Sequence, residues 1–70
     1  MKELRIHTDY ITLGQALKLT GEVDSGIEAK IRIHDGEVQV NHEVDTRRGK
    51  KLYDGDVFEI NHHVYVIHAD

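Results

Sequence analysis

Residues 25–36 of the sequence read SGIEAKIRIHDG, and their pattern fits two different secondary structures. Every second residue of 29–33 is apolar, which is the alternation of a half-buried strand. Ser25 and Glu28, however, have the spacing of a capping box, and Gly36 stands where a glycine commonly ends a helix. Because a start signal and a stop signal bracket the segment at a suitable length, we expect a helix here.

This helix would carry its apolar side chains in two stripes. The stripes are Ile27 with Ile31 and Ala29 with Ile33. Lys30 and His34 lie one turn apart between them. We therefore expect a helix that packs on two sides and has a basic seam between the packed faces.

A shorter helix is expected just before it. Thr12 and Gln15 form a first capping box, and Gly21 is well placed as the C-terminal stop. The apolar residues between these signals share one side at helical spacing; they are Leu13, Ala16 and Leu17.

The rest of the chain predicts short strands separated by turns. Residues 3–7 alternate in polarity, and strand-like segments recur from Val38 to Ile67. Turns are expected at residues 41–43, at 54–55 and at 61–63. A strand, two helices and then several strands predict an α+β fold, with two short helices packed on a small, mostly antiparallel sheet. No linker or repeat interrupts residues 1–70, so we expect one domain.

The composition excludes several classes of protein. There are no cysteines, so disulfides and thiolate metal sites are excluded. The six histidines show no short ligand spacing, and we expect no metal site. Serine is represented only by the helix cap Ser25, so no nucleophile with its base can be identified, and we expect neither catalysis nor a cofactor. The first residues resemble neither a signal peptide nor a membrane anchor, and we expect a soluble, cytoplasmic protein.

The basic residues are concentrated although the protein is acidic. The formal net charge is −4, which argues against a protein that coats DNA nonspecifically. Yet four of the nine basic residues lie in the stretch Arg47-Arg48-Gly49-Lys50-Lys51. Such a patch is typical of a directed contact with a polyanion, although a charged loop can also be no more than a solvated surface.

Several short motifs, taken in order, resemble a known family. They are residues 25–30 (SGIEAK), 36–41 (GEVQVN) and 55–57 (GDV), together with 11–15 (ITLGQ) and 47–52 (RRGKKL). This order resembles the S4-type RNA-binding domain, in its stand-alone YaaA/YbcJ-like bacterial branch. The resemblance covers most of the chain and implies a helix-pair surface that binds structured RNA, with ribosomal RNA or an assembling ribosomal subunit as the partner. The family often has a basic residue directly after the opening serine, where this chain has a glycine.

The candidate RNA-binding residues follow from the basic patch and this resemblance. They are Arg47, Arg48, Lys50, Lys51, Lys30, Arg32, Asn41 and Ser25. The two loop arginines suit bidentate phosphate contacts, the lysines act as mobile point charges, and a glycine between them allows a tight turn or a close approach to a phosphate. Four of these side chains also have structural interpretations. Lys30 could be a solvated side chain, Arg32 could pair with Glu28 or Asp35, Asn41 could be a turn residue, and Ser25 could be a helix cap.

One alternative function uses the same patch. A small adaptor domain of the β-grasp kind could bind an acidic face of a protein through these cations. The carrier members of that class need a C-terminal Gly-Gly, whereas this chain ends His68-Ala69-Asp70. No membrane partner and no DNA partner are expected.

Overall fold

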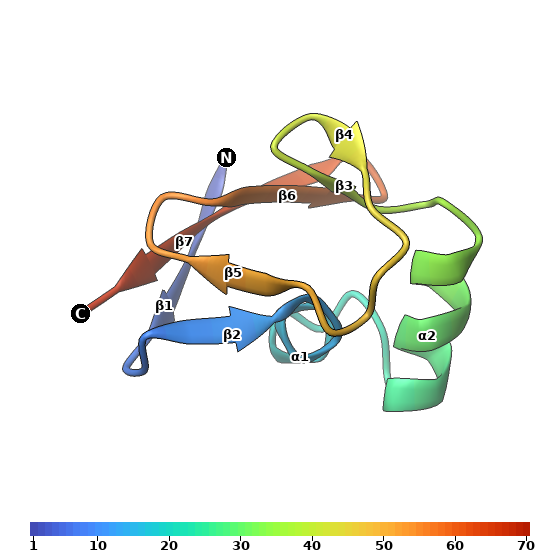
Figure 1. The fold of residues 1–70 in the computed structure, drawn as a ribbon, viewed down its shortest axis with the longest axis horizontal. Coiled ribbons are helices and arrows are strands. Elements are labelled where there is room, and N and C mark those ends of the chain that lie inside the picture. Colours follow the sequence, from blue (N-terminus) through green and yellow to red (C-terminus); the bar gives the residue numbers. More distant parts are fainter.

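A computed structural model describes all 70 residues (Figure 1). The two helices are α1 (Leu13–Leu19) and α2 (Gly26–His34). The strands are β1 (Lys2–Ile6), β2 (Tyr10–Thr12), β3 (Gln39–Val40), β4 (Glu43–Val44), β5 (Lys51–Tyr53), β6 (Val57–Ile60) and β7 (His63–Ala69). Neither helix has the length and apolar character needed to span a membrane.

Both helices begin at the residues that the capping signals predict. The Thr12 hydroxyl accepts a hydrogen bond from the backbone N–H of Gln15, and the Gln15 side chain reaches back to the Thr12 backbone, as in a complete capping box. Ser25 caps α2 in the same way, but the Glu28 carboxylate reaches one residue further and accepts from the Asp24 N–H. The helical prediction for residues 25–36 is therefore confirmed, and the strand alternative is excluded.

The strands form two sheets. The larger has the order β1-β7-β6-β3-β4, in which only the β1–β7 pair is parallel. Both hairpins of this sheet turn on an Asn-His pair with positive φ, at residues 41–42 and 61–62. The α+β class, with two short helices and a mostly antiparallel sheet, is thus confirmed.

The second sheet pairs β2 with β5, and the sequence pattern does not predict it. The sequence pattern predicts Thr12 only as a helix cap. In the structure Tyr10–Thr12 also forms a strand, which pairs antiparallel with Lys51–Tyr53. Ile11 lies opposite Leu52, and both are buried. The turn at residues 54–55 therefore leads from one sheet to the other. A three-residue strand is too short to show a periodic pattern, which is why β2 escapes prediction.

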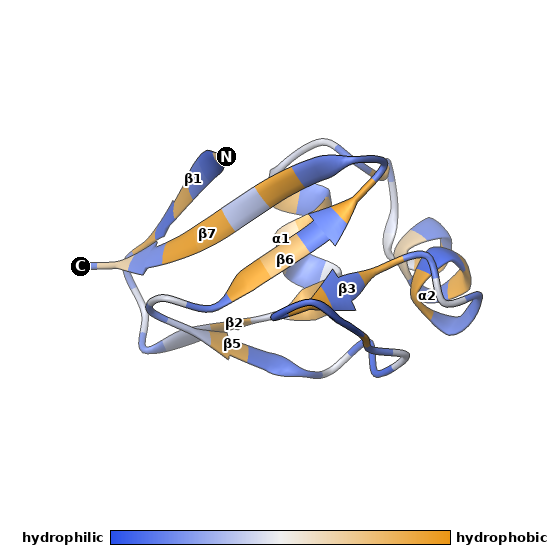
Figure 2. Ribbon diagram, turned by 90° about the horizontal axis from the view of Figure 1, so that it is seen from above, coloured by the Kyte–Doolittle hydropathy of each residue, from blue (hydrophilic) through white to orange (hydrophobic).

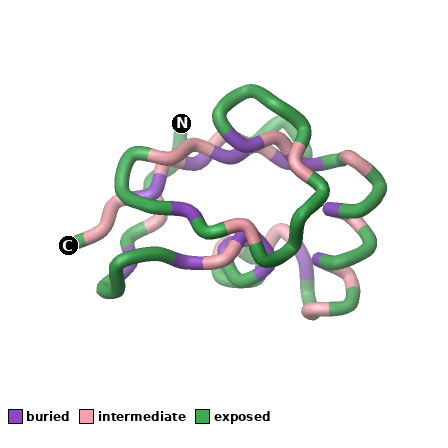
Figure 3. Tube along the Cα trace, in the orientation of Figure 1, coloured by how far each residue is buried: buried purple, intermediate pink, exposed green.

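One core holds the helices and both sheets together. Apolar residues recur along the helices and strands in Figure 2, and Figure 3 marks buried positions on both helices and on both sheets; fifteen of these buried residues form one cluster. Its largest fully buried side chains are Phe58, Leu13, Leu17, Ile33, Leu52, Ile60, Ile67 and Val38. Phe58 stacks on Tyr65 with ring centroids 5.0 Å apart. Burial of these side chains supplies most of the stabilisation of so small a chain.

The expected two-sided packing of α2 is wrong. Ala29 and Ile33 are fully buried, but Ile27 and Ile31 remain 75% and 53% exposed. The sheet and α1 cover only one side of the helix, so the second apolar stripe faces solvent. A helix of this length at the end of a small fold has only one layer to pack against.

Candidate nucleic-acid interface

The loop of residues 45–50 leads from β4 in the larger sheet to β5 in the smaller one (Figure 1). On its way it packs against the first turn of α1. The backbone N–H of Leu13 donates to the Lys50 carbonyl at 2.8 Å, and that of Gly14 donates to the Arg48 carbonyl at 3.0 Å. These two N–H groups belong to the first turn of the helix and have no partner within it. The loop thus satisfies the start of α1 and is held in place by it.

Gly14 is the position where the loop approaches the helix most closely. A Cβ atom built on Gly14 would lie 2.7 Å from Cγ of Arg48, a distance that real Cβ atoms do not tolerate. The aliphatic stem of Arg48 therefore crosses α1 where only a glycine leaves room for it. This contact directs Arg48 over the junction between α1 and the loop.

A hollow of about 330 Å³ opens beside Arg48. Its lining residues come from the two helices and the loop, and we call it the glycine groove; they are Thr12, Gly14, Gln15, Lys18, Gly26, Ala29, Arg48 and Gly49. Two of them are cationic, and none is acidic. The groove therefore carries two positive charges and no negative charge, and its glycines leave room for a ligand to come close. Such a groove suits a phosphate group.

Lys18 is the one cation of this groove that is not among the residues predicted from the sequence. It stands alone in the sequence, outside any basic run, and therefore carries no charge-cluster signal. The sequence offers only its spacing: Lys18 lies four residues after Gly14, on the same face of α1.

Arg47 lies in the predicted basic patch but is bound to a carboxylate. Its Nε and Nη2 donate to the two oxygens of Asp45 at 3.0 and 2.8 Å, and its backbone N–H donates to one of them at 3.0 Å. The hydrogen bond from the Arg47 side chain lowers the pKa of Asp45, against a smaller opposing effect of burial. Asp45 is largely buried while Arg47 stays exposed. The pair stabilises the conformation of the loop and occupies the planar edge that a phosphate would use.

Three other predicted site residues have structural partners. Ser25 caps α2, as its alternative interpretation holds. The Asn41 side chain accepts from the Val57 N–H at 3.0 Å and donates to Asp56 at 3.2 Å, so it stabilises the β3–β4 turn. Arg32 pairs with Glu37 at 2.6 Å and with Glu28 at 3.8 Å, rather than with Asp35. The C-terminal turn of α2 carries the chain back toward Arg32, which brings Glu37 within reach.

The remaining predicted cations make no ion pair within the chain. Lys30 is exposed on α2, Lys50 is half-buried in the loop, and Arg48 is exposed beside the groove. Lys51 begins β5 and places its Nζ 4.8 Å from the ring centroid of Tyr10. Gly49 has no positive φ, and a Cβ there would meet nothing within 4 Å. The expected tight turn is present, because the Lys50 N–H donates to the Arg47 carbonyl at 3.1 Å with Arg48 and Gly49 between them, but its backbone does not require a glycine.

A largely buried carboxylate fixes the helix pair against the sheet. Glu22 lies between α1 and α2, and its Oε1 accepts a hydrogen bond from Asn61 Nδ2 at 3.0 Å. Its Oε2 accepts from the Tyr65 hydroxyl and lies 2.7 Å from His63 Nδ1. Burial alone would raise the pKa of Glu22, but these hydrogen bonds outweigh it and lower the pKa to about 2. Arg32 also donates to the Asn61 side chain, which links α2 to the same network.

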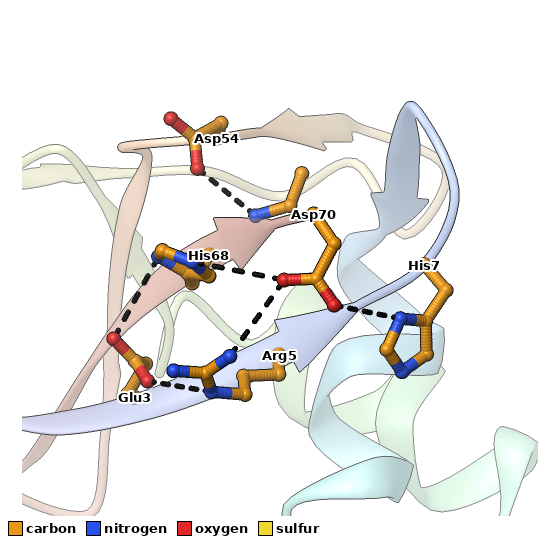
Figure 4. A network of polar contacts seen from close by, with 7 residues as sticks. Glu3, Arg5, His7, Asp54, His68 and Asp70 are labelled. Atoms are coloured by element: carbon orange, nitrogen blue, oxygen red, sulfur yellow. Dashed lines mark hydrogen bonds and ion pairs between the residues drawn. The ribbon is translucent and has the colours of Figure 1, made fainter.

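The histidines do not gather into a metal site. His7 and His68 lie near the ends of β1 and β7, where they contact Asp70 and Glu3 on the surface (Figure 4). Arg5 joins the same carboxylates, so this cluster consists of alternating charges. No group of three or more potential metal ligands is present in the structure.

The tight approach at Gly14 leads to a first prediction. Gly14→Ala should lower the free energy of unfolding by about 1 to 2 kcal/mol, because the added methyl group forces Arg48 and the loop away from α1. Gly26→Ala is the matched control, since a Cβ at Gly26 meets nothing within 4 Å and alanine favours the helix. Urea unfolding measures both variants. Equal stability of Gly14→Ala and Gly26→Ala would contradict the contact.

Comparison with known proteins places the chain in a family. The family model for the S4 domain matches residues 4–68. Bacillus subtilis (strain 168) has a relative named "Probable ribosome maturation protein RlbA", which is 54% identical over 57 residues, covering 81% of this chain and 80% of that protein. The protein YbcJ of Escherichia coli (strain K12) is 37% identical over 59 residues, covering 83% of this chain and 84% of its own.

A solved structure agrees with these sequence matches. The solution structure of YbcJ from E. coli, whose description reports an αL motif involved in RNA binding, superimposes with a TM-score of 0.74 at 31% identity, and the match covers 99% of this chain and 89% of that one. The family model spans nearly the whole sequence, and the superposition includes the helices, the sheet and the connecting loop. The chain therefore belongs to the S4 domain family.

Proposed function

We propose that this protein binds structured RNA through the glycine groove and the adjacent loop cations, and that its target is ribosomal RNA or an assembling ribosomal subunit. The observation that carries the proposal is the pairing of Lys18 and Arg48 at a groove without acidic residues. The RNA-binding motif described for YbcJ and the ribosome maturation name of RlbA support the choice of RNA and of the ribosome.

The groove suits the chemistry of an RNA double helix. The major groove of such a helix is too narrow for side chains, so proteins recognise phosphates, 2′-hydroxyls and shape. Arg48 makes no ion pair within the chain, and its planar guanidinium can donate two hydrogen bonds to a phosphate. Lys18 adds a point charge from α1. Glycines in the groove floor allow a sugar-phosphate chain to approach closely.

Internal pairing concentrates the unpaired positive charge on this face, although the chain as a whole is acidic. Asp45 is paired with Arg47, and Glu28 and Glu37 share Arg32. Apart from Lys2 on β1, the cations left without such a partner lie on α1, α2, the loop and the start of β5; they are Lys18, Lys30, Arg48, Lys50 and Lys51. Their potential can therefore act on a polyanion in spite of the net charge of −4.

A salt titration tests the proposal. The wild-type protein is titrated separately with an RNA hairpin, with naked ribosomal RNA and with purified ribosomal subunits, at increasing salt concentration. We expect the logarithm of the association constant for the hairpin to fall by roughly 0.7 to 0.9 per phosphate contact for each log unit of salt. A protein that binds no RNA at low salt, or whose affinity does not change with salt, would overturn the proposal.

The same titration separates the RNA target from a protein target. If the ribosomal subunits are bound while the hairpin and naked ribosomal RNA are not, the cations contact an acidic protein surface, as the adaptor hypothesis requires. Binding to naked ribosomal RNA with the same salt dependence as to the subunits supports the RNA proposal.

A further inference from the structure

The outer face of the small β2–β5 sheet carries two exposed tyrosines. Residues that alternate along a strand point to opposite faces, and the buried pair of Ile11 and Leu52 defines the inner one. The outer face therefore consists of the two remaining cross-strand pairs, and we call it the tyrosine face; its members are Tyr10, Tyr53, Thr12 and Lys51.

The two aromatic rings are available for contact. Tyr10 and Tyr53 are 39% and 49% exposed, and their ring centroids lie 5.8 Å apart at an interplanar angle of 49°. The Lys51 ammonium covers the ring of Tyr10, whereas no cation covers the ring of Tyr53. Neither hydroxyl makes a hydrogen bond within the chain, and neither ring belongs to the core. The fold thus leaves two tilted aromatic rings beside a positive charge in solvent.

This face is continuous with the glycine groove. Thr12 belongs to both, since it is the last residue of β2 and also lines the groove. Tyr10 lies two residues earlier on the same face, about 7 Å away along the strand. Lys51 is opposite Thr12, and Tyr53 is opposite Tyr10. An RNA strand that leaves the groove at Thr12 would therefore meet the lysine first and the tyrosines next.

We propose that the tyrosine face stacks an unpaired nucleobase that adjoins the RNA helix bound in the groove, with the base on Tyr53 and the neighbouring phosphate at Lys51. This inference rests on the proposed function and specifies its substrate as a helix with a single-stranded end or bulge. Unpaired bases are the part of RNA that stacks on exposed aromatic side chains, and such stacking tolerates any base. A protein partner would need a larger apolar area than two tyrosines provide.

The experiment compares RNAs that share one hairpin. The first has a blunt end, two others carry three unpaired adenosines at the 5′ or the 3′ end, and two more carry abasic residues in place of those adenosines. We expect one of the adenosine extensions to tighten binding by about five- to hundredfold, because each stacked base contributes a gain of that order. The abasic extension keeps the phosphates and should lose most of the gain.

Two variants assign the gain to Tyr53. Tyr53→Ala should bind the blunt hairpin as the wild type does but lose the advantage of the extended RNA, while Tyr53→Phe should retain it because the ring remains. Tyrosine fluorescence gives a second readout: the chain has no tryptophan, and Tyr65 is buried, so quenching by the extended RNA reports on the tyrosine face.

The results separate the two proposals. Stacking is overturned if neither extension tightens binding, if the abasic extensions tighten it equally, or if Tyr53→Ala weakens the blunt and extended hairpins alike. Failure of every hairpin to bind at low salt overturns the proposed function, and the stacking proposal falls with it. The blunt hairpin could instead bind with steep salt dependence while no extension tightens binding. That result would exclude the stacking proposal and leave the proposed function intact.

Discussion

Arg48→Glu is expected to lower the affinity for a hairpin RNA by a factor of about 10 to 100, because the variant loses a charge-assisted contact to phosphate. It also places a negative charge at a groove whose remaining cation is Lys18. The slope of log affinity against log salt should fall by roughly 0.7 to 0.9, the value for one contact. Fluorescence anisotropy of a labelled hairpin over a salt series measures both quantities.

Lys2→Glu is the matched control for Arg48→Glu. It changes the net charge by the same amount, and Lys2 lies on β1, which is far from α2 and the loop (Figure 1). We expect its affinity to stay within about twofold of the wild type, since exposed charges further apart than the Debye length, about 8 Å at physiological salt, are largely screened. Equal loss of affinity in both variants would show that overall charge, rather than the groove, determines binding.

Glu22→Gln is expected to lower the free energy of unfolding at pH 7 by about 2 kcal/mol, because Tyr65, Asn61 and His63 would lose a charged acceptor. The wild-type protein should also lose stability in acid. The pKa of Glu22 is about 2 in the folded protein, below the ordinary value of 4.5. The stability that ionised Glu22 contributes is therefore complete at pH values above 4.5, and it is lost as the pH falls toward 2.

Urea unfolding at pH 7, 5 and 3 measures this acid dependence. Between about pH 5 and pH 3 the wild type should lose more stability than Glu22→Gln, whose side chain does not titrate. Glu43→Gln serves as the control, because Glu43 is exposed and makes no side-chain hydrogen bond or ion pair within the chain. Parallel pH profiles for the wild type and Glu22→Gln would contradict the role assigned to the network.

The helices of this protein could be predicted because their signals are local. A cap, a residue three positions later and a terminal glycine are all read within about ten residues, and the hydrogen bonds they make are formed within the same segment. The alternation of residues 29–33 was the competing signal. It failed because the capped helix needs only one buried stripe, that of Ala29 and Ile33, to join the core.

The strand β2 and the partner of β5 could not be predicted in this way. Their pairing joins Tyr10–Thr12 to Lys51–Tyr53 across most of the chain, and neither segment is long enough to reveal its partner. The groove depends on the same pairing, because it brings the loop of residues 45–50 onto the start of α1. Lys18 enters the candidate site only through that arrangement.

The sequence by itself was sufficient for the helix boundaries, the α+β class, the family resemblance and the concentration of basic residues near Arg48. Only the tertiary structure shows which of these cations are free, because their partners are set by distance in space. Arg47 is paired with Asp45 within the loop, whereas Arg32 donates hydrogen bonds to Glu37 and to Asn61, which is 29 residues away. Charge is a property of each residue, whereas the availability of that charge depends on what the fold places beside it.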